Sequence, residues 1–268
     1  MTDTHPRIAI IGLGAMGATV LEHLRHSLPH GAFAALVRAE RLKEIQHRHG
    51  IDAFAETAAL ANWRPDLVVE CASHEAVAKT VPALLQRGIA CVVASIGATA
   101  AQGVLEQLQA AAAAGGARLV FASGAIGGLD ALRCARRADI QAVTYTGRKP
   151  PHAWRGSAAE EELDLDTIST ATAFFHGNVA EAALRYPKNT NVTAAVALAG
   201  IGFEQTRVRL VADPALAQNM HEVTAKGDFG TFEFSIQNNP LPSNPRTSML
   251  AALSIEASVI DYFQAVGF

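Results

Sequence analysis

The sequence is poor in cysteine, aromatic residues and net charge. Its three cysteines, Cys71, Cys91 and Cys134, are an odd number without C-x-x-C spacing, and we predict that they are small buried apolar residues. Aromatic residues make up only 6% of a chain that is 50% hydrophobic, so the core must consist mainly of Ala, Val, Leu and Ile. The net charge of −3, without a basic run, argues against a surface that binds nucleic acid.

Long apolar runs and metal-binding motifs are also missing. Residues 1–6 lack the charged segment of an export signal, and no stretch reaches the roughly 18 apolar residues of a membrane-spanning helix. The ten histidines are scattered, without H-E-x-x-H or another metal-ligand spacing. We therefore expect a cytoplasmic protein that holds no metal and binds neither a membrane nor nucleic acid.

The most informative feature that is present is a glycine-rich turn near the N-terminus. An apolar strand at residues 7–11 leads directly into this turn, and a helical pattern follows it. In a dinucleotide-binding turn, the first glycine permits the tight turn, the second lets the backbone approach a diphosphate, and the third lets the helix pack on the strand. The alternative is a tight structural turn. We expect cofactor binding by Gly12, Gly14, Ala15, Met16 and Gly17.

The residue after the second predicted strand bears on the choice of cofactor. That strand, residues 32–37, ends at Arg38, where NAD-specific enzymes usually carry an acidic residue. A guanidinium there can pair with the 2′-phosphate of NADP. In the alternative interpretation Arg38 is a solvated loop charge and Glu40 reaches the ribose. The cofactor is therefore predicted as NAD or NADP.

Helical and extended patterns alternate in the first half of the chain, as a parallel sheet requires. Strands are predicted at residues 65–72, 88–95 and 118–122. Because ligands of open parallel sheets lie beyond the carboxyl ends of the strands, the loops there should line one crevice. The residues expected in it are Ala72, Ser73, Ser95 and the loop 123–128.

The pattern changes after Asp130. Strands with alternating polarity are predicted at residues 140–146, 205–212, 220–225 and 230–236, with a loop at 147–151 and a helix at 191–200. The predicted fold is α/β: a Rossmann-type parallel-sheet domain, residues 1–124, and a smaller α+β substrate and catalytic domain, residues 125–244. We expect the second domain to have a mixed or antiparallel sheet whose face closes over the nicotinamide. A final helix, from Thr247 to about Phe263 within residues 245–268, is expected to pack on the first domain.

Four motifs together resemble the L-aspartate dehydrogenases of the NAD biosynthesis branch, and the resemblance covers nearly the whole chain. Many dehydrogenases share the first motif, whereas the other three together are specific. The motifs are Gly12-Leu13-Gly14-Ala15-Met16-Gly17, Ser123-Gly124-Ala125-Ile126-Gly127-Gly128, Tyr186-Pro187-Lys188-Asn189-Thr190-Asn191-Val192 and His221-Glu222-Val223.

The resemblance implies NAD(P)-dependent oxidation of L-aspartate to iminoaspartate. This product either hydrolyses to oxaloacetate and ammonia or passes on toward quinolinate. By position, the resemblance implies that His221 is the acid/base residue and that Ala125 and Asn191 contact the cofactor. The chemistry suits a histidine, because its reference pKa of about 6.5 lets it exchange protons near neutrality. The alternatives are a structural His221 and an Asn191 that caps the following helix.

A substrate with two carboxylates needs cationic or several neutral hydrogen-bond donors. Lys188 is the first candidate and Arg246 a weaker one, with Thr193, Thr224 and Ser123 as neutral donors. Each of these has the alternative of an ordinary surface or structural role. We also expect a homo-oligomer, specifically a dimer.

Two other classes of function stay open from the sequence. The same plan of two domains serves homoserine dehydrogenase and dihydrodipicolinate reductase, which also use NAD(P) on small amino-acid metabolites. A protein that senses NAD(P) without turnover would retain the fold and bind the cofactor tightly, but it would act on no amino acid.

Overall fold

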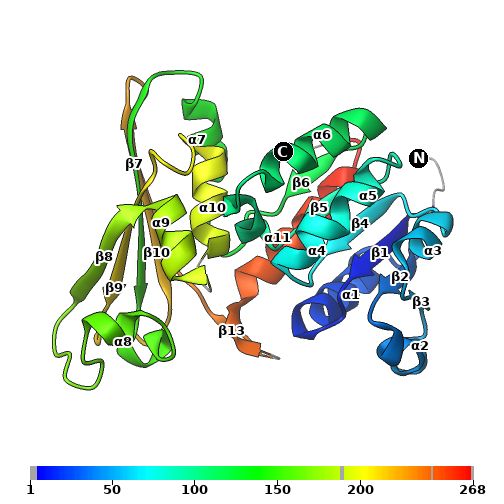
Figure 1. The fold of residues 1–268 in the computed structure, drawn as a ribbon, viewed down its shortest axis with the longest axis horizontal. Helices are drawn as coiled ribbons and strands as arrows, with labels where there is room; N and C mark the ends of the chain where they lie inside the picture. Colours follow the sequence, from blue (N-terminus) through cyan, green and yellow to red (C-terminus); the bar gives the residue numbers. More distant parts are fainter. Residues whose placement is uncertain (1–4, 188–189, 243, 267–268) are drawn as a thin grey trace. The chain divides into compact units, whose positions relative to one another are not determined.

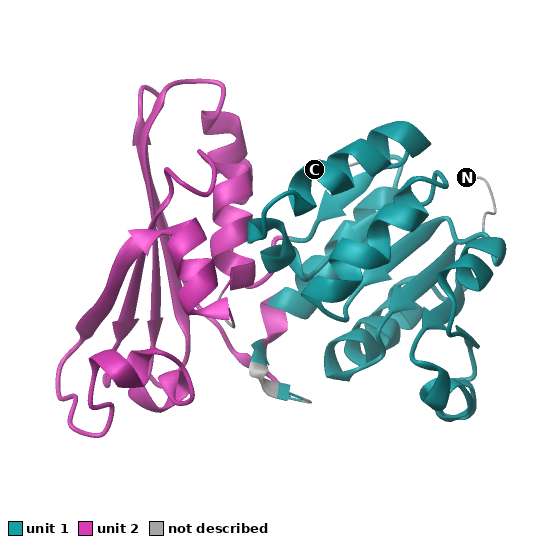
Figure 2. Ribbon diagram, viewed as in Figure 1, with its two compact units in different colours: residues 1–122, 242–247, 251–268 teal, residues 123–241, 248–250 magenta. Residues whose placement is uncertain are grey.

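The structure is a computed structural model that describes residues 5–187, 190–242 and 244–266. Contacts divide the chain into two compact units, coloured separately in Figure 2. Unit 1 comprises the described parts of residues 1–122, 242–247 and 251–268, and unit 2 comprises residues 123–241 and 248–250. The first boundary therefore falls two residues before the predicted one.

Unit 1 contains a six-stranded parallel sheet with the strand order β3-β2-β1-β4-β5-β6 (Figure 1). The order reverses between β1 and β4, which is the switch point where ligands of open α/β sheets bind. The predicted Rossmann-type sheet is thus confirmed. The strands are β1 (Arg7–Ile11), β2 (Ala32–Leu36), β3 (Asp52–Phe54), β4 (Leu67–Glu70), β5 (Ala90–Val93) and β6 (Leu119–Phe121).

Apolar helix faces cover this sheet. Leu60, Val77, Leu84 and Leu108 pack in one cluster with strand residues such as Val68. The helical segments are α1 (Ala15–Ser27), η1 (Ala39–Arg41), α2 (Leu42–His49), α3 (Thr57–Asn62), α4 (His74–Lys79), α5 (Val81–Leu85), η2 (Ile96–Ala100), α6 (Val104–Gly115) and α11 (Met249–Phe263).

The last helix is tied to the first by polar contacts. The Glu256 carboxylate lies 3.0 Å from Nδ1 of His23 and 2.5 Å from the Ser27 hydroxyl. Helix α11 begins at Met249, two residues later than predicted, because residues 244–248 form strand β13 (Asn244–Ser248), after the short β12 (Pro240–Leu241).

Unit 2 contains a five-stranded mixed sheet with the order β11-β10-β7-β9-β8. Only the β7–β9 pair is parallel, so the prediction of a mixed sheet is confirmed. The strands are β7 (Ile140–Lys149), β8 (Thr172–Asn178), β9 (Arg207–Ala212), β10 (Met220–Gly227) and β11 (Gly230–Gln237). The helical segments are α7 (Leu129–Ala135), η3 (Pro151–Trp154), α8 (Ala159–Glu162), α9 (Val179–Arg185) and α10 (Thr190–Ala199). Helix α9 contacts β8 and β9, and α10 packs against α7 and α9 (Figure 1).

The predicted loop at residues 147–151 is wrong at its start, because β7 continues to Lys149. Gly147 suggested a turn, but it is a strand residue over which the Tyr145 side chain extends. A Cβ atom at Gly147 would lie 2.8 Å from the Tyr145 hydroxyl oxygen. The extension matters because it places Tyr145 and Lys149 on the same face of the strand.

In the described part of the chain, the search for a helix of sufficient length and apolar character to cross a bilayer finds no candidate.

Candidate active site

The glycine-rich turn has the geometry that its sequence predicts. Gly12 has φ +85°, and a Cβ atom there would lie 2.7 Å from Cβ of Ala72 on the neighbouring loop. A Cβ atom at Gly17 would lie 2.0 Å from the Gly12 carbonyl oxygen. Both glycines are therefore required for packing. Gly14 is exposed and a Cβ atom there would meet no described atom within 4 Å, so its backbone is open to a ligand.

The turn ends at the start of α1, where Gly14 is the N-cap and Ala15 and Met16 are the first helical residues. No side chain caps this helix, and its first turn carries no acidic residue. The free N–H groups and the positive end of the helix dipole favour an anion at this position.

A pocket of about 520 Å³ lies at the carboxyl end of the sheet in unit 1. It brings together five of the predicted cofactor-binding residues, namely Gly12, Gly14, Arg38, Ala72 and Ser73. Ser95, also expected in this crevice, is not in the pocket lining. Its N–H and hydroxyl groups bind the Glu70 carboxylate instead, at 2.9 Å each.

Glu70 is a site residue that sequence reasoning missed. It ends β4 with 0% of its surface exposed, and its carboxylate also accepts the backbone N–H groups of Ala72 and Ser73 at 2.7 and 2.9 Å. One buried carboxylate thus ties the loop after β4 to the loop after β5. An acidic residue at the end of an otherwise apolar strand was the available signal, because buried charges are rare unless they are paired.

Arg38 lies on the rim of the pocket. Its side chain is 79% exposed, and its guanidinium forms an ion pair of 3.2 Å with Glu40. Arg41, which the sequence analysis did not single out, is held more firmly, because it donates to the Leu13 carbonyl at 3.2 Å and to both oxygens of Glu44 at 3.1 Å. The hydrogen bond to Glu44 raises the pKa of Arg41 further.

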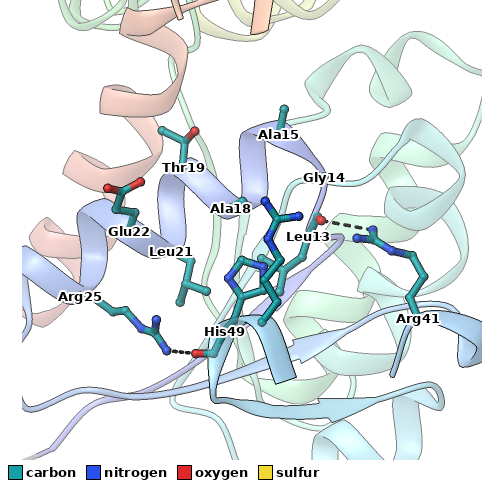
Figure 3. A pocket seen from close by; sticks show the side chains of 11 residues that line it. Leu13, Gly14, Ala15, Ala18, Thr19, Leu21, Glu22, Arg25, Arg41 and His49 are labelled. Atoms are coloured by element: carbon teal, nitrogen blue, oxygen red, sulfur yellow. Dashed lines mark hydrogen bonds between the residues drawn. The ribbon is translucent and has the colours of Figure 1, made fainter. Parts of the chain in front are cut away.

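Arg41 also lines a second pocket, of about 660 Å³, beside α1 (Figure 3). The other basic side chains that line this second pocket are Arg25, Arg48 and His49. The Arg25 guanidinium donates a hydrogen bond to the His49 carbonyl. Burial and the charges of Arg48 and Arg25 lower the pKa of His49. The glycine-rich turn therefore lies between two pockets that share Arg41, Leu13 and Gly14.

His221 lies on the buried face of the sheet in unit 2, with 7% of its surface exposed. Its strand alternates, so Val223 and Ala225 are also buried. The Tyr145 hydroxyl lies 2.7 Å from Nδ1 of the imidazole. Nδ1 is thus engaged, and Nε2 is the ring nitrogen left for a substrate.

The register explains how these two side chains meet. His221 pairs with Gly147 and Val223 pairs with Tyr145, so the two polar groups are diagonal neighbours across β7 and β10. Because Gly147 has no side chain, the Tyr145 ring can extend across it to reach the imidazole.

Lys149 follows Gly147 on the same face of β7, as a further diagonal neighbour of His221. Its ammonium nitrogen lies 4.8 Å from the centroid of the Trp154 ring, at the distance of a cation–π contact. Trp154 is buried and donates to the Val211 carbonyl at 3.0 Å. Sequence reasoning missed Lys149 because it treated this segment as a loop.

Burial controls the ionisation of these groups. It lowers the pKa of His221 to about 3, with a further contribution from the charge of Lys149. It also lowers the pKa of Lys149 to about 8, and it raises the pKa of Tyr145. The imidazole is therefore neutral at pH 7, which differs from the expectation that it titrates near neutrality.

Glu222, the second residue of the motif His221-Glu222-Val223, faces the other way. Glu222 lies on the opposite face of β10 and pairs with Arg148 at 2.6 Å, while Arg148 also lies 3.9 Å from Asp213. This ion pair links β10 to β7 and supports the register that places His221. Thr224, a candidate donor to the substrate, is exposed on the face opposite His221.

The remaining predicted residues have separate positions. Asn191 is exposed in the first turn of α10, and the Thr193 hydroxyl donates to the Thr190 carbonyl within that helix at 3.0 Å. The Ala125 carbonyl accepts from the buried Asn238 at 2.8 Å. Lys188 lies outside the described residues. Arg246 is in β13, and its side chain lies outside the described part.

The described residues contain no group of three or more His, Cys, Asp or Glu side chains that could hold a metal ion. A dinucleotide-binding turn at the switch point of a parallel sheet, with a buried histidine in the second unit, is typical of nicotinamide-dependent dehydrogenases. Residues 12–122 match the family model of the homoserine dehydrogenase NAD-binding domain, and residues 130–262 match that of the aspartate dehydrogenase C-terminal domain.

Sequence similarity to named relatives extends over almost all of the chain. L-aspartate dehydrogenase from Ralstonia pickettii is 44% identical over 253 residues, covering 92% of this chain and 94% of the relative. The Pseudomonas aeruginosa enzyme of the same name is 43% identical and covers 97% and 98%. The crystal structure of aspartate dehydrogenase from Thermotoga maritima superimposes with a TM-score of 0.78 at 30% identity, over 99% and 100% of the two chains. The chain belongs to the L-aspartate dehydrogenase family.

A homoserine dehydrogenase of a hyperthermophilic archaeon shares the fold alone, with a TM-score of 0.59 and 12% identity. The homoserine dehydrogenase alternative is not favoured, because the named relatives at 43–44% identity over more than nine-tenths of the chain are L-aspartate dehydrogenases.

Proposed function

We propose that this chain catalyses the NAD(P)-dependent oxidative deamination of L-aspartate to iminoaspartate. Similarity to L-aspartate dehydrogenases over more than nine-tenths of the chain is the observation that carries this proposal. Iminoaspartate either hydrolyses to oxaloacetate and ammonia or serves the synthesis of quinolinate.

The residues of unit 1 fit a dinucleotide. Gly14 leaves its backbone open, the start of α1 offers uncapped N–H groups, and Ala72 is held close to Gly12. These groups would bind the diphosphate and the adjoining ribose, with Ala15, Met16, Gly17, Arg38 and Ser73 around them. When it is bound, the nicotinamide supplies the acceptor for the hydride that leaves the substrate carbon. We also propose that Ala125 and Asn191 contact the cofactor, as the motifs imply.

We assign the proton transfers to His221. A neutral imidazole can take a proton at Nε2 from the water that attacks the imine, while its Nδ1–H group donates to the phenolic oxygen of Tyr145. Because the phenol is itself neutral and buried, it can accept this hydrogen bond without becoming charged. The Tyr145 hydroxyl thereby fixes the orientation in which Nε2 faces the substrate.

The direct test is to incubate the purified protein with L-aspartate and either NAD or NADP. We expect reduced nicotinamide, followed at 340 nm, and ammonia in equal amounts. His221→Ala should lower kcat by two or more orders of magnitude, a usual size for the loss of an acid/base group, and leave cofactor affinity nearly unchanged. The control is His176→Ala, because His176 is an exposed histidine on β8 of the same unit.

The outcomes separate the possible roles. Absence of turnover with L-aspartate, together with tight cofactor binding, would indicate an NAD(P) sensor. Turnover with homoserine instead would assign the chain to that activity. Equal rates for His221→Ala and the parent would remove His221 from the mechanism.

We further propose that the enzyme is a cytoplasmic homodimer. β11 lies at the edge of the second sheet and has no fully buried residue, so its outer backbone groups offer a surface for a second copy. Sedimentation equilibrium of the full chain would test the dimer, and a monomer at micromolar concentration would contradict it.

A further inference from the structure

We propose that the Lys149 ammonium group binds one carboxylate of the dicarboxylate substrate, beside His221. This inference rests on the proposed function, because the carboxylate that Lys149 would bind belongs to the proposed substrate, L-aspartate. Lys149 takes the role for which the sequence suggested Lys188 and Arg246, and its side chain is among those that the structure describes.

Lys149 lies on the same sheet face as His221. Tyr145, Gly147 and Lys149 alternate along one face of β7, and His221 lies opposite Gly147 on β10. Diagonal neighbours on one face of an antiparallel pair lie about 7 Å apart, within the combined reach of a lysine and a small substrate. A substrate held at the imidazole can therefore place a carboxylate at the ammonium group.

The charge of Lys149 acts on His221. Lys149 is the one charged residue in the described part of the chain whose field contributes to lowering the pKa of His221. The nearest cation along the strand, Arg148, has its side chain on the other face and engages Glu222 and Asp213. An anion at Lys149 would offset its charge, and it would therefore raise the pKa of His221 toward the range in which an imidazole exchanges protons.

A buried aromatic ring holds the Lys149 ammonium group in position. Its ammonium nitrogen lies over the Trp154 ring at 4.8 Å, and the indole is itself fixed by the hydrogen bond to Val211. A cation–π contact keeps a lysine charge in place without neutralising it. A substrate carboxylate can form a charge-assisted hydrogen bond with this ammonium group.

The binding of succinate is compared with the binding of butanoate to test whether Lys149 binds a second carboxylate. The two compounds have the same number of carbons and no amine, and they differ by one carboxylate. Binding is measured on the full chain, saturated with oxidised cofactor, in a Trp63→Phe background. Trp154 is then the single tryptophan, and its fluorescence reports on events at Lys149. Isothermal titration gives an independent dissociation constant.

The variants are Lys149→Met, which removes the charge, and Lys149→Arg, which keeps it. Lys226→Met is the matched control, since Lys226 is an exposed lysine on β10. Lys149→Met should weaken succinate binding about 10- to 100-fold, the usual size for a hydrogen bond to a charged group, and should leave butanoate much less affected. Lys149→Arg should retain part of the affinity, and Lys226→Met should retain all of it. Cofactor affinity should be unchanged throughout.

A second measurement follows the affinity for succinate as a function of pH. Above a pH of about 8 the lysine loses its charge, so succinate affinity of the parent should fall between pH 7 and 10. The titratable groups beside Lys149 among the described residues are His221, Tyr145 and, against the Trp154 ring, Tyr186. The pKa of His221 is lowered to about 3 and those of the two tyrosines are raised, so none of them accounts for a fall in affinity centred near pH 8. Lys149→Arg should show no such fall, because guanidinium stays protonated.

Succinate binding by Lys149→Met equal to that of the parent, in a variant with unchanged circular dichroism, would overturn the proposal. If Lys149→Met does not fold, Lys149→Gln takes its place with the same expectation. A parent enzyme that oxidises L-aspartate while Lys149 is irrelevant to succinate would refute this inference alone. A parent that binds succinate through Lys149 but does not oxidise L-aspartate would refute the proposed activity alone.

Discussion

The Tyr145 hydroxyl and Nδ1 of His221 lie 2.7 Å apart, on neighbouring strands of one buried sheet face. Because the ring of Tyr145 passes over a residue without a side chain, this contact depends on Gly147 as well as on its two partners. The imidazole therefore has a fixed orientation before any substrate binds.

Tyr145→Phe should lower kcat about 10-fold or more while KM for L-aspartate and cofactor affinity change little. The ring still packs, but the imidazolium loses the oxygen that accepts from Nδ1–H, and the pKa of His221 falls further. The acidic limb of the kcat profile should therefore move to lower pH, which a purely structural defect would not cause. Tyr262→Phe is the control, because Tyr262 makes a longer contact of 3.4 Å in unit 1. An unchanged pH profile in Tyr145→Phe would contradict this role.

The low pKa of His221 should also appear in the pH dependence of stability. The folded imidazole has a pKa of about 3, whereas in the unfolded chain it titrates near 6.5. Between these values only the unfolded state binds the proton, so the free energy of unfolding falls as pH decreases below about 6.5. One such group contributes up to about 1.4 kcal/mol per pH unit.

Urea unfolding at pH 5 and pH 7, followed by Trp154 fluorescence in the Trp63→Phe background, measures this effect. His221→Gln lacks the titrating group, so its loss of stability between the two pH values should be smaller by about 2 kcal/mol. Equal losses in the variant and the parent would mean that the folded imidazole is not protected from protonation. His176→Gln is the control, since His176 is exposed.

The outline of the fold could be predicted from the sequence because its signals are local. An apolar strand, the glycine-rich turn and a helix follow one another within residues 7–27, and Gly12 and Gly17 are required by their nearest neighbours. Glu70 and Lys149 escaped prediction because their roles depend on contacts with other strands. The burial of the Glu70 carboxylate is explained by the N–H groups of two loops that are distant in sequence. The face on which Lys149 lies is known only once the register of β7 and β10 is known.

β8 also shows why part of the fold was not predicted. This strand has a register irregularity between Ala173 and Phe175 against β9, so its apolar residues do not follow a regular alternation. The helix after it, α9, was not predicted either, although Asn178 and Glu181 form a capping box at its start. The candidate cations Lys188 and Arg246 were chosen from charge and neighbourhood, and neither side chain is among those described.

Glu70→Gln should weaken cofactor binding and destabilise unit 1. The described groups that bind this carboxylate, three backbone N–H groups and the Ser95 hydroxyl, all act as hydrogen-bond donors. The glutamine amide group would turn its own N–H donors toward some of these donors, so those hydrogen bonds would be lost. Loss of buried charge-assisted hydrogen bonds costs about 2 to 4 kcal/mol. Titration with NADH, followed by its fluorescence, should show a dissociation constant raised about 10-fold, and Glu106→Gln on the exposed side of α6 should match the parent. Unaltered affinity would show that the loops after β4 and β5 hold their positions without this carboxylate.

Arg38 and Arg41 should determine the preference between NAD and NADP. Both line the pocket at the carboxyl end of the first sheet, and Arg41 is anchored to the carbonyl of Leu13 in the glycine-rich turn. A 2′-phosphate requires a cation, whereas a carboxylate at the end of β2 favours a ribose with two free hydroxyls. Arg38→Asp should therefore shift the ratio of kcat/KM values from NADP toward NAD by about 10- to 100-fold, and Arg41→Ala should shift it in the same direction. Arg48→Asp is the matched control, because Arg48 lines the pocket beside α1 and not the pocket at the carboxyl end of the sheet, and it should leave the ratio unchanged. If the ratio is the same in all four proteins, the 2′-phosphate does not lie near these guanidinium groups.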